Sequence, residues 1–221
     1  MENKSIRLFT LPNLITLMNL AAGCGAAVMA LKYGNLKNAF WLIIIAAVFD
    51  FLDGFAARLT KQYSEVGKQL DSLADMVSFG FAPAAILYVI HLSSGGHGYF
   101  VFVVALFAAL RLAKFNVDDS QHDSFVGLPT PASALFIASA GWLFADGAFV
   151  VSSLATVLTA VFLSYFMVSP LRMFALKFKD FKWKGNEVRY IFIGLSAVAI
   201  AVFRVYAVPF IISAYILTSL V

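Results

Sequence analysis

The sequence has little charge, one cysteine and no polar linker. Only 13% of its 221 residues are Asp, Glu, Lys or Arg, and 62% are hydrophobic, whereas an average soluble domain has about 25% charged residues. A soluble core of this length cannot hide so much apolar surface, so we expect lipid to solvate it. The single cysteine, Cys24, excludes a disulfide within the chain. The net charge of +4 is modest, and we attribute it to membrane topology and not to a nucleic-acid partner.

The chain contains no low-complexity segment and no run of Pro or Ser that would separate domains. We therefore expect one all-α domain over residues 1–221, a polytopic transmembrane helical bundle. Within it we assign an interfacial segment to 1–12, the active-site helices to 13–145 and C-terminal spans to 149–220. We expect no cleavable signal peptide, because Leu11 to Leu31 is long enough to cross a membrane.

The apolar residues predict about eight membrane spans. A spanning helix needs about 20 apolar residues. The stretches that approach this length are 13–31, 38–57, 70–91, 98–115, 130–145, 149–171, 188–204 and 206–220. The last two can instead form one kinked helix, because Pro209 lies close to the proposed turn between them.

The Lys and Arg residues predict the orientation. If the N-terminus is cytosolic, all but three of the 16 fall in cytosolic segments, and the exceptions are Lys32, Lys37 and Arg204. Cytosolic loops carry an excess of Lys and Arg, so we expect both termini in the cytosol. We expect an integral protein of the inner (cytoplasmic) membrane, with residues 58–75 at the cytosolic face.

Carboxylates gather at the end of the second span and the start of the third. Asp50 and Asp53 are three residues apart and share one helix face. Asp71 and Asp75 are four apart and share a face of the next helix. The short connection after Arg58 makes these helices antiparallel neighbours. The carboxylates can then converge in a cavity below the headgroups, with Asp50 roughly 12 Å inside Arg58.

This arrangement favours divalent metal ions and phosphate chemistry. A carboxylate at membrane depth is costly and therefore rare unless it has a function. Two divalent cations would balance the four negative charges, and an all-oxygen site favours Mg²⁺, Mn²⁺ or Ca²⁺ over zinc. Two such ions about 3.5–4 Å apart suit in-line displacement at phosphorus. Gly54 and Ala57 leave room for a ligand beside the backbone, and Arg58 offers a planar donor for a phosphate oxygen.

The acids also admit interpretations without catalysis. Two acids on a transmembrane helix can form a structural ion pair, or line a proton or cation pathway. A cation transporter would need acids on several spans and an opening to both faces. Here the acids cluster at one face, and the outer halves of the spans carry almost none, which disfavours transport.

The string D-x2-D-G-x2-A-R-x8-G-x3-D-x3-D resembles the signature of the CDP-alcohol phosphotransferases. The matching positions are Asp50, Asp53, Gly54, Ala57, Arg58, Gly67, Asp71 and Asp75. The resemblance implies a membrane enzyme that transfers a substituted phosphate from a CDP-linked lipid or alcohol to an acceptor hydroxyl and releases CMP. It implies two divalent cations, Mg²⁺ or Mn²⁺, on the four aspartates, with Asp75 as general base. The residues that it implies for CDP binding are Asp53, Gly54, Ala57, Arg58 and Gly67.

Three further stretches, 78–84, 111–116 and 125–132, resemble one branch of the family, the membrane-integral phosphatidylserine synthases. This branch implies a CDP-diacylglycerol-type lipid as donor and L-serine as acceptor. Homodimers are common in the family, so we expect a homodimer in the bilayer. The alternative is the same chemistry on glycerol 3-phosphate, inositol phosphate or another alcohol. A phosphorylated acceptor would need more Lys and Arg near the aspartates than the chain offers.

Four polar residues are candidates for substrate contacts. Arg111 and Lys114 can pair with a serine carboxylate, although basic residues at a cytosolic helix end are also ordinary topology flanks. Asn116 can bind a polar group of either substrate. Asn13, which shares a helix face with Thr16, can contact the diphosphate or act as the N-cap of the first span.

Overall fold

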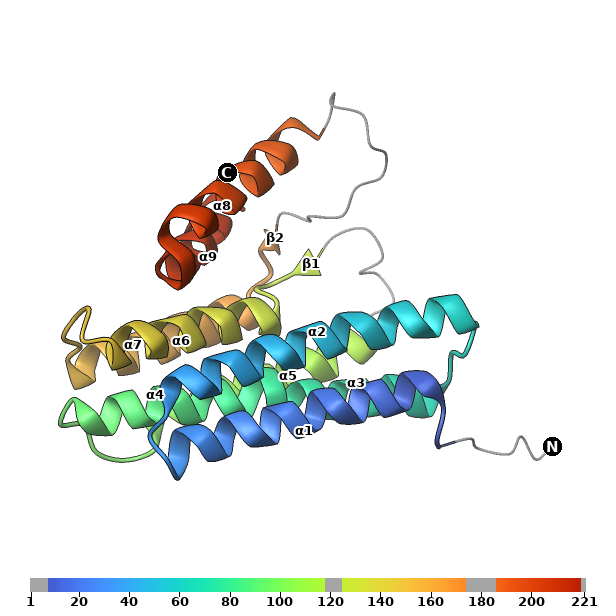
Figure 1. The fold of residues 1–221 in the computed structure, drawn as a ribbon, viewed down its shortest axis with the longest axis horizontal. Coiled ribbons are helices and arrows are strands. Elements are labelled where there is room, and N and C mark those ends of the chain that lie inside the picture. Colours follow the sequence, from blue (N-terminus) through green and yellow to red (C-terminus); the bar gives the residue numbers. More distant parts are fainter. Residues whose placement is uncertain (1–7, 118–124, 174–185, 220–221) are drawn as a thin grey trace.

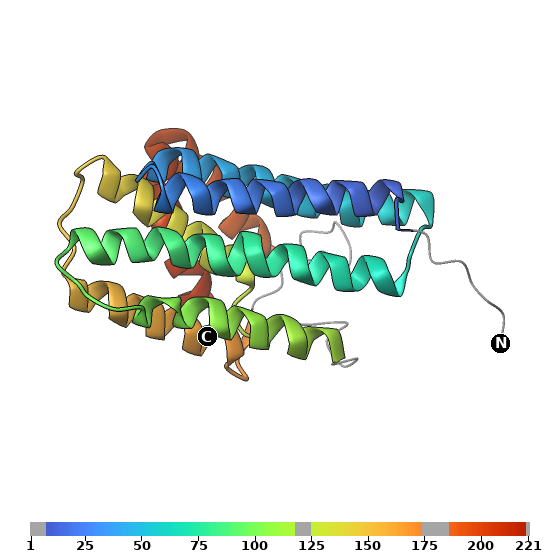
Figure 2. The ribbon, with the colours of Figure 1, turned by 90° about the horizontal axis from the view of Figure 1, so that it is seen from below.

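A computed structural model describes residues 8–117, 125–173 and 186–219 of the chain. Most of its helices run lengthwise in one bundle, and a C-terminal pair stands at an angle to it (Figures 1 and 2). The elements are α1 (Leu11–Leu31), α2 (Leu36–Thr60), α3 (Glu65–Asp75), η1 (Met76–Phe81), α4 (Ala82–Ser93), η2 (Phe100–Phe102), α5 (Val103–Val117), β1 (Phe125–Val126), α6 (Thr130–Ala145), α7 (Ser153–Val168), β2 (Arg172–Met173), α8 (Glu187–Phe203), η3 (Arg204–Tyr206) and α9 (Ala207–Thr218). The predicted polytopic helical bundle is confirmed.

Five helical segments of the described chain are long and apolar enough to cross a membrane, and α6 and α7 are shorter apolar helices. Each of the eight predicted stretches overlaps at least one observed helix, and the 70–91 stretch overlaps α3, η1 and α4. The stretch predicted at 149–171 is helical only from Ser153 to Val168, because Ser152 caps its start and β2 follows its end. The predicted interfacial segment at 1–12 lies largely outside the described residues, and helix α1 begins at Leu11.

Helices α1 and α2 pack closely because small side chains face one another. Ala26 and Ala30 of α1 are fully buried, as are Ala39 and Ala46 of α2. Small residues let the backbones of membrane helices approach, which increases van der Waals contact where lipid supplies no hydrophobic driving force. This pairing holds the second half of α2 beside the start of α1 (Figure 1).

The connection between α2 and α3 is short and is fixed by both helix ends. Lys61 closes α2 in the left-handed conformation, with φ of 55°, and donates its backbone N–H to the carbonyl of Ala57. Ser64 caps α3, since its Oγ accepts from the backbone N–H of Gly67 at 3.0 Å. The predicted reversal of chain direction is therefore present, and both helices pack on α1. Figure 1 shows their connection at the same end of the bundle as the start of α1.

The third segment, from α3 through η1 to α4, is the most buried of the candidate spans. In its most apolar window 67% of the residues are buried, against 33–39% in α1, α2 and the η2–α5 segment. Immediately after Asp75 the helix widens into the π-helix η1, a feature often found at functional sites. Gly23 of α1 packs against the backbone of Ser78 there, so closely that a Cβ at position 23 would overlap it.

The segment before α6 is tied to the end of α7. Strands β1 and β2 pair antiparallel, with Phe125 opposite Met173. The backbone N–H of Leu128 donates to the carbonyl of Phe166 at 2.8 Å. Gly127 has φ of +77° and lies directly against the carbonyl of Met167, so a side chain does not fit here. Helix α6 then begins at Thr130 as a rigid, proline-led helix start.

The C-terminal apolar stretch forms two helices and not one kinked helix. Arg204 has φ of 52°, and η3 joins α8 to α9. Val188 and Thr218, at opposite ends of the stretch, line the same apolar cavity between the two helices, so α8, η3 and α9 form a C-terminal hairpin. The hairpin packs on α6 through η3 and α9, whereas α8 has no buried residue.

Candidate active site

Helices α2 and α3 bring three carboxylates together. Asp50 and Asp53 lie one turn apart on α2, and Asp71 lies on α3. Carboxylate oxygens of these three residues all lie within 4.8 Å of one another. Asp53 is buried, whereas Asp50 and Asp71 are half-buried. The convergence predicted from the spacing is therefore present for three of the four aspartates.

Asp75 lies beside these three carboxylates but is held differently. It is the last residue of α3 and lies within electrostatic range of Asp50 and Asp71. Its Oδ1 accepts a hydrogen bond from Nδ2 of Asn19 at 3.1 Å. We refer to Asp50, Asp53, Asp71 and Asp75 together as the acid cluster.

Helix α1 supplies a polar face to the acid cluster. The hydroxyl of Thr16 donates a hydrogen bond to Oδ2 of Asp53 at 2.6 Å. Asn19, one turn further along, donates from its side-chain Nδ2 to Asp75, and its backbone carbonyl accepts from the Ser78 hydroxyl at 3.0 Å. Sequence reasoning missed Asn19. The signal was its spacing of three residues from Thr16, which continues a polar face along an otherwise apolar helix.

Asn13 is buried on the same face but is not the N-cap of α1. Thr10 is the cap, since its hydroxyl accepts from the backbone N–H of Asn13. The prediction that Asn13 could be the N-cap of this helix is therefore wrong. The helix begins at Leu11, two residues before the predicted start at residue 13. Nδ2 of Asn13 donates to the carbonyl of Leu8 at 2.8 Å. A Cβ added to Gly67 would lie 3.1 Å from Oδ1 of Asn13, so these two predicted site residues are neighbours.

The other residues expected to bind CDP lie on the open side of α2. Gly54 is exposed, and a Cβ added there would meet no atom within 4 Å. Ala57 is half-buried and Arg58 is exposed one turn further on. A ligand can therefore reach the α2 backbone beside Asp53 without displacing a side chain.

Helix α5 places the three predicted acceptor residues in different surroundings. Arg111 is buried and lies within electrostatic range of Asp75. Lys114 is exposed. Asn116 donates through its side-chain Nδ2 to the hydroxyl of Ser72 at 2.8 Å, and its backbone carbonyl accepts from Nζ of Lys68 at 2.9 Å. The contacts of Asn116 therefore join α5 to α3 beside the acid cluster.

The acid cluster has the chemistry of a divalent cation site. Within the described ranges, none of its four carboxylates forms an ion pair with Lys, Arg or His. Oδ1 of Asp71 and Oδ1 of Asn19 are buried and have no hydrogen-bond partner. Several half-buried carboxylates without a positive partner are strongly unfavourable unless a cation joins them. The all-oxygen donor set fits Mg²⁺ or Mn²⁺ and does not identify which ion binds.

Comparison with known proteins identifies relatives that share this region. The family model for CDP-alcohol phosphatidyltransferases matches residues 9–183. A CDP-diacylglycerol–serine O-phosphatidyltransferase of Bacillus subtilis (strain 168) is 32% identical over 185 residues, which cover 80% of this chain and 94% of that protein. The protein of the same name from Mycobacterium tuberculosis (strain ATCC 25618 / H37Rv) is 40% identical over 140 residues, or 60% of this chain and 49% of that protein.

The extent of the match differs between relatives. The matched part covers about half the length of the mycobacterial relatives. A relative from Methanocaldococcus jannaschii, also named CDP-diacylglycerol–serine O-phosphatidyltransferase, is 37% identical over 131 residues, which cover 59% of this chain and 60% of that protein. The family match includes every residue of the acid cluster and all the predicted substrate residues.

Proposed function

The chain belongs to the CDP-alcohol phosphatidyltransferase family, and on this premise we propose that it transfers the phosphatidyl group of CDP-diacylglycerol to the hydroxyl of L-serine. The products would be phosphatidylserine and CMP. The observation that carries the proposal is the convergence of Asp50, Asp53 and Asp71, with Asp75 beside them, in a chain of apolar helices. The names of the similar proteins support serine as the acceptor.

The donor would bind with its nucleotide between α1 and α2. The open backbone at Gly54 and Ala57 can admit the CDP group, with Arg58 as a donor to a phosphate oxygen. Gly67 and Asn13 are neighbours, and we propose that they and Asp53 also contact the CDP group. The lipid chains would extend into the bilayer beside the apolar helices.

Asp50, Asp53, Asp71 and Asp75 would hold two divalent cations. When bound, the cations would neutralise the diphosphate charge and stabilise the leaving CMP oxygen. Thr16 and Asn19 orient two of the carboxylates through their hydrogen bonds. Such outer hydrogen bonds fix the direction of the ligand oxygens before substrate arrives.

Asp75 would act as the general base. A serine hydroxyl is a weak nucleophile at neutral pH and needs a positioned proton acceptor. Since Oδ1 of Asp75 accepts from Asn19, Oδ2 is the oxygen left to receive the serine proton. The serine oxygen would then form the new bond to the lipid phosphorus, the bond from phosphorus to the CMP oxygen would break, and CMP would leave in line.

The acceptor would be held by α5. The buried Arg111 is the partner that we propose for the serine carboxylate. Lys114, exposed at the same end of α5, would attract anionic substrates, and Asn116 would help to hold the acceptor side of the pocket against α3. We further propose one domain over residues 1–221, a homodimer, and an orientation with both termini and the acid cluster facing the cytosol.

The direct test is acceptor-dependent CMP release. Purified protein is incubated with CDP-diacylglycerol and Mg²⁺ or Mn²⁺, and separately with L-serine, glycerol 3-phosphate or inositol 1-phosphate. Among the three acceptors, we expect only L-serine to give CMP release and a new phospholipid. Release with one of the phosphorylated acceptors in place of serine would reject serine as the substrate while retaining the family chemistry.

A further inference from the structure

A closed ring of three hydrogen bonds joins α3 to the end of α5. The ammonium of Lys68 donates to the backbone carbonyl of Asn116 at 2.9 Å. The side-chain Nδ2 of Asn116 donates to the hydroxyl of Ser72 at 2.8 Å, and that hydroxyl donates to the backbone carbonyl of Lys68 at 3.3 Å. Each of the three residues is both a donor and an acceptor, and we call this set the Lys68 ring.

Lys68 satisfies a backbone group that α5 cannot satisfy by itself. Asn116 is the last residue but one of α5, and the final four carbonyls of a helix have no partner within that helix. A positive charge at this end also interacts favourably with the helix dipole. Lys68 is therefore a C-terminal cap of α5 that a different helix supplies.

The Lys68 ring lies on one side of Asp75, and a second contact with α5 lies on the other. Ser72 is three residues before Asp75, one turn away on α3. Directly after Asp75, the π-helix η1 packs on α5. Otherwise α3 packs on α1, and α5 packs on α7. The ring thus holds the end of α5 against the part of α3 that carries Asp71 and Asp75.

We propose that Lys68 is a positioning residue for the acceptor, which sets the place of Arg111 relative to Asp75 through the Lys68 ring. This inference rests on the proposed function, in which Asp75 accepts the serine proton and Arg111 pairs with the serine carboxylate. These two groups lie on α3 and α5 and must stay at the spacing of one serine molecule, because a small misplacement of reacting groups lowers the rate strongly.

The same geometry separates Lys68 from the donor lipid. Lys68 follows Gly67, one of the residues proposed to contact CDP, so a phosphate contact is the competing interpretation of its charge. Its ammonium is instead directed to the end of α5, and none of the hydrogen bonds in the Lys68 ring involves α1 or α2. The inference therefore predicts an effect on the acceptor and not on the donor.

The test is Lys68→Met, which removes the ammonium and keeps an unbranched side chain. We expect the KM for L-serine to rise about three- to tenfold, the range for loss of one hydrogen bond, with the KM for CDP-diacylglycerol unchanged. Lys68→Arg keeps a cationic donor and should restore most of the serine affinity. Lys61→Met is the matched control, because Lys61 is an exposed lysine of the same α2–α3 connection outside the ring, and both of its KM values should match wild type.

A double-variant cycle tests the ring without any substrate. Asn116→Ala removes the donor to Ser72, and Lys68→Met removes the donor to Asn116, so each variant weakens the same ring. The fall in the thermal unfolding midpoint of the double variant should be smaller than the sum of the two single falls, and the serine KM should show the same non-additivity. Strictly additive falls in midpoint would reject the ring.

Three kinetic results would overturn the inference while the proposed function stands. One is a wild-type serine KM in Lys68→Met. Another is a raised KM for CDP-diacylglycerol alone, which would make Lys68 a phosphate ligand of the donor. The third is an equal rise in serine KM in Lys61→Met, which would leave only a general effect of charge. If the wild-type protein shows no serine-dependent CMP release at all, the proposed function itself fails, and the role of Lys68 in holding the acceptor is rejected with it.

Discussion

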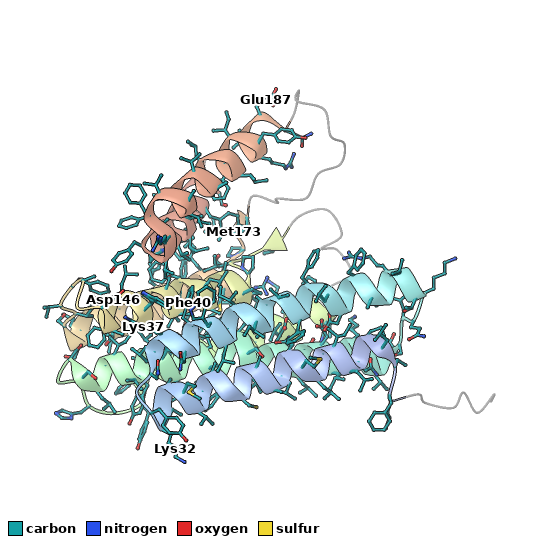
Figure 3. The ribbon with its side chains drawn as sticks, in the orientation of Figure 1. Lys32, Lys37, Phe40, Asp146, Met173 and Glu187 are labelled. Atoms are coloured by element: carbon teal, nitrogen blue, oxygen red, sulfur yellow. The ribbon has the colours of Figure 1, made fainter. Side chains whose placement is uncertain are left out.

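The bundle carries carboxylates at two places, which differ in whether a positive side chain pairs with them. Asp146, at the end of α6, pairs with Lys37 and accepts hydrogen bonds from Nε1 of Trp142 at 2.8 Å and from the hydroxyl of Tyr206 at 3.1 Å. Figure 3 shows Lys37 and Asp146 side by side at the end of the bundle away from the N-terminus. The acid cluster has no such cation partner among the described residues.

The comparison separates a structural carboxylate from carboxylates kept for a ligand. Every partner of Asp146 comes from the chain, and together they join α2, α6 and the C-terminal hairpin. The acid cluster has hydrogen bonds from Thr16 and Asn19 that orient it, yet its charge remains unbalanced. Acids in a membrane helix bundle are costly and rare without a function, and this unbalanced charge supports the proposal that the acid cluster holds cations.

The largest expected effect follows removal of divalent ions. Treatment with a chelator should reduce CMP release to background, and readdition of Mg²⁺ or Mn²⁺ should restore it, because no Lys, Arg or His of the described residues forms an ion pair with the acid cluster. Bound manganese, measured by elemental analysis, should approach two ions per chain in wild type. Full activity after exhaustive chelation would show that the acid cluster, like Asp146, needs no metal ion.

Asp75→Asn should have the next largest effect. Loss of a general base lowers kcat by about 10²–10⁴-fold, whereas binding of CDP-diacylglycerol should persist because Asp50, Asp53 and Asp71 remain. Turnover is followed as CMP release, and donor binding as a shift of the thermal unfolding midpoint. Asp146→Asn is the matched control and should keep its kcat. Normal turnover in Asp75→Asn would remove the base assignment.

A smaller effect is expected from Asn19→Ala. The variant loses the hydrogen bond that orients Asp75 and leaves the acids themselves in place. Outer hydrogen bonds of metal sites commonly contribute about 10–100-fold to affinity or activity, so we expect kcat to fall by about tenfold. Asn19→Gln should not restore it, because the longer side chain displaces the amide. An unchanged kcat in Asn19→Ala would show that Asp75 needs no orienting group.

The smallest effect concerns the Asp146 contacts. The hydrogen bond from Lys37, followed by those from Tyr206 and Trp142, holds the pKa of Asp146 below its usual value. A lowered pKa means that this group stabilises the fold above its unfolded pKa of about 3.9 and loses that contribution as pH falls through the folded pKa. Asp146→Asn should lower the unfolding midpoint at pH 7 by no more than about 2–4 °C.

The pH dependence supplies the check on that interpretation. The difference in midpoint between wild type and Asp146→Asn should be full at pH 7 and should shrink below about pH 4. Turnover at pH 7 should stay near wild type, because Asp146 lies at the other end of the bundle from the acid cluster. A difference in midpoint that is constant from pH 7 to pH 3 would exclude a contribution from the charge of Asp146.

Much of the fold could be predicted from local pattern. Apolar stretches long enough to span a bilayer predicted the helices, and the short connection after Arg58 predicted that α2 and α3 run in opposite directions. The boundaries of the 149–171 stretch were wrong because the cap at Ser152 sets a later start for α7, and strand β2, which pairs with β1, follows its end. Those interactions involve partners that hydropathy does not report.

The sequence by itself determined the pairs Asp50 with Asp53 and Asp71 with Asp75, because the period of a helix fixes which neighbours share a face. Only the tertiary structure decided that Thr16 of α1 binds Asp53 and that Asn19 of the same helix binds Asp75. These contacts join helices distant in the chain. Their geometry depends on how small residues such as Gly23 let backbones approach, and no local period encodes that packing.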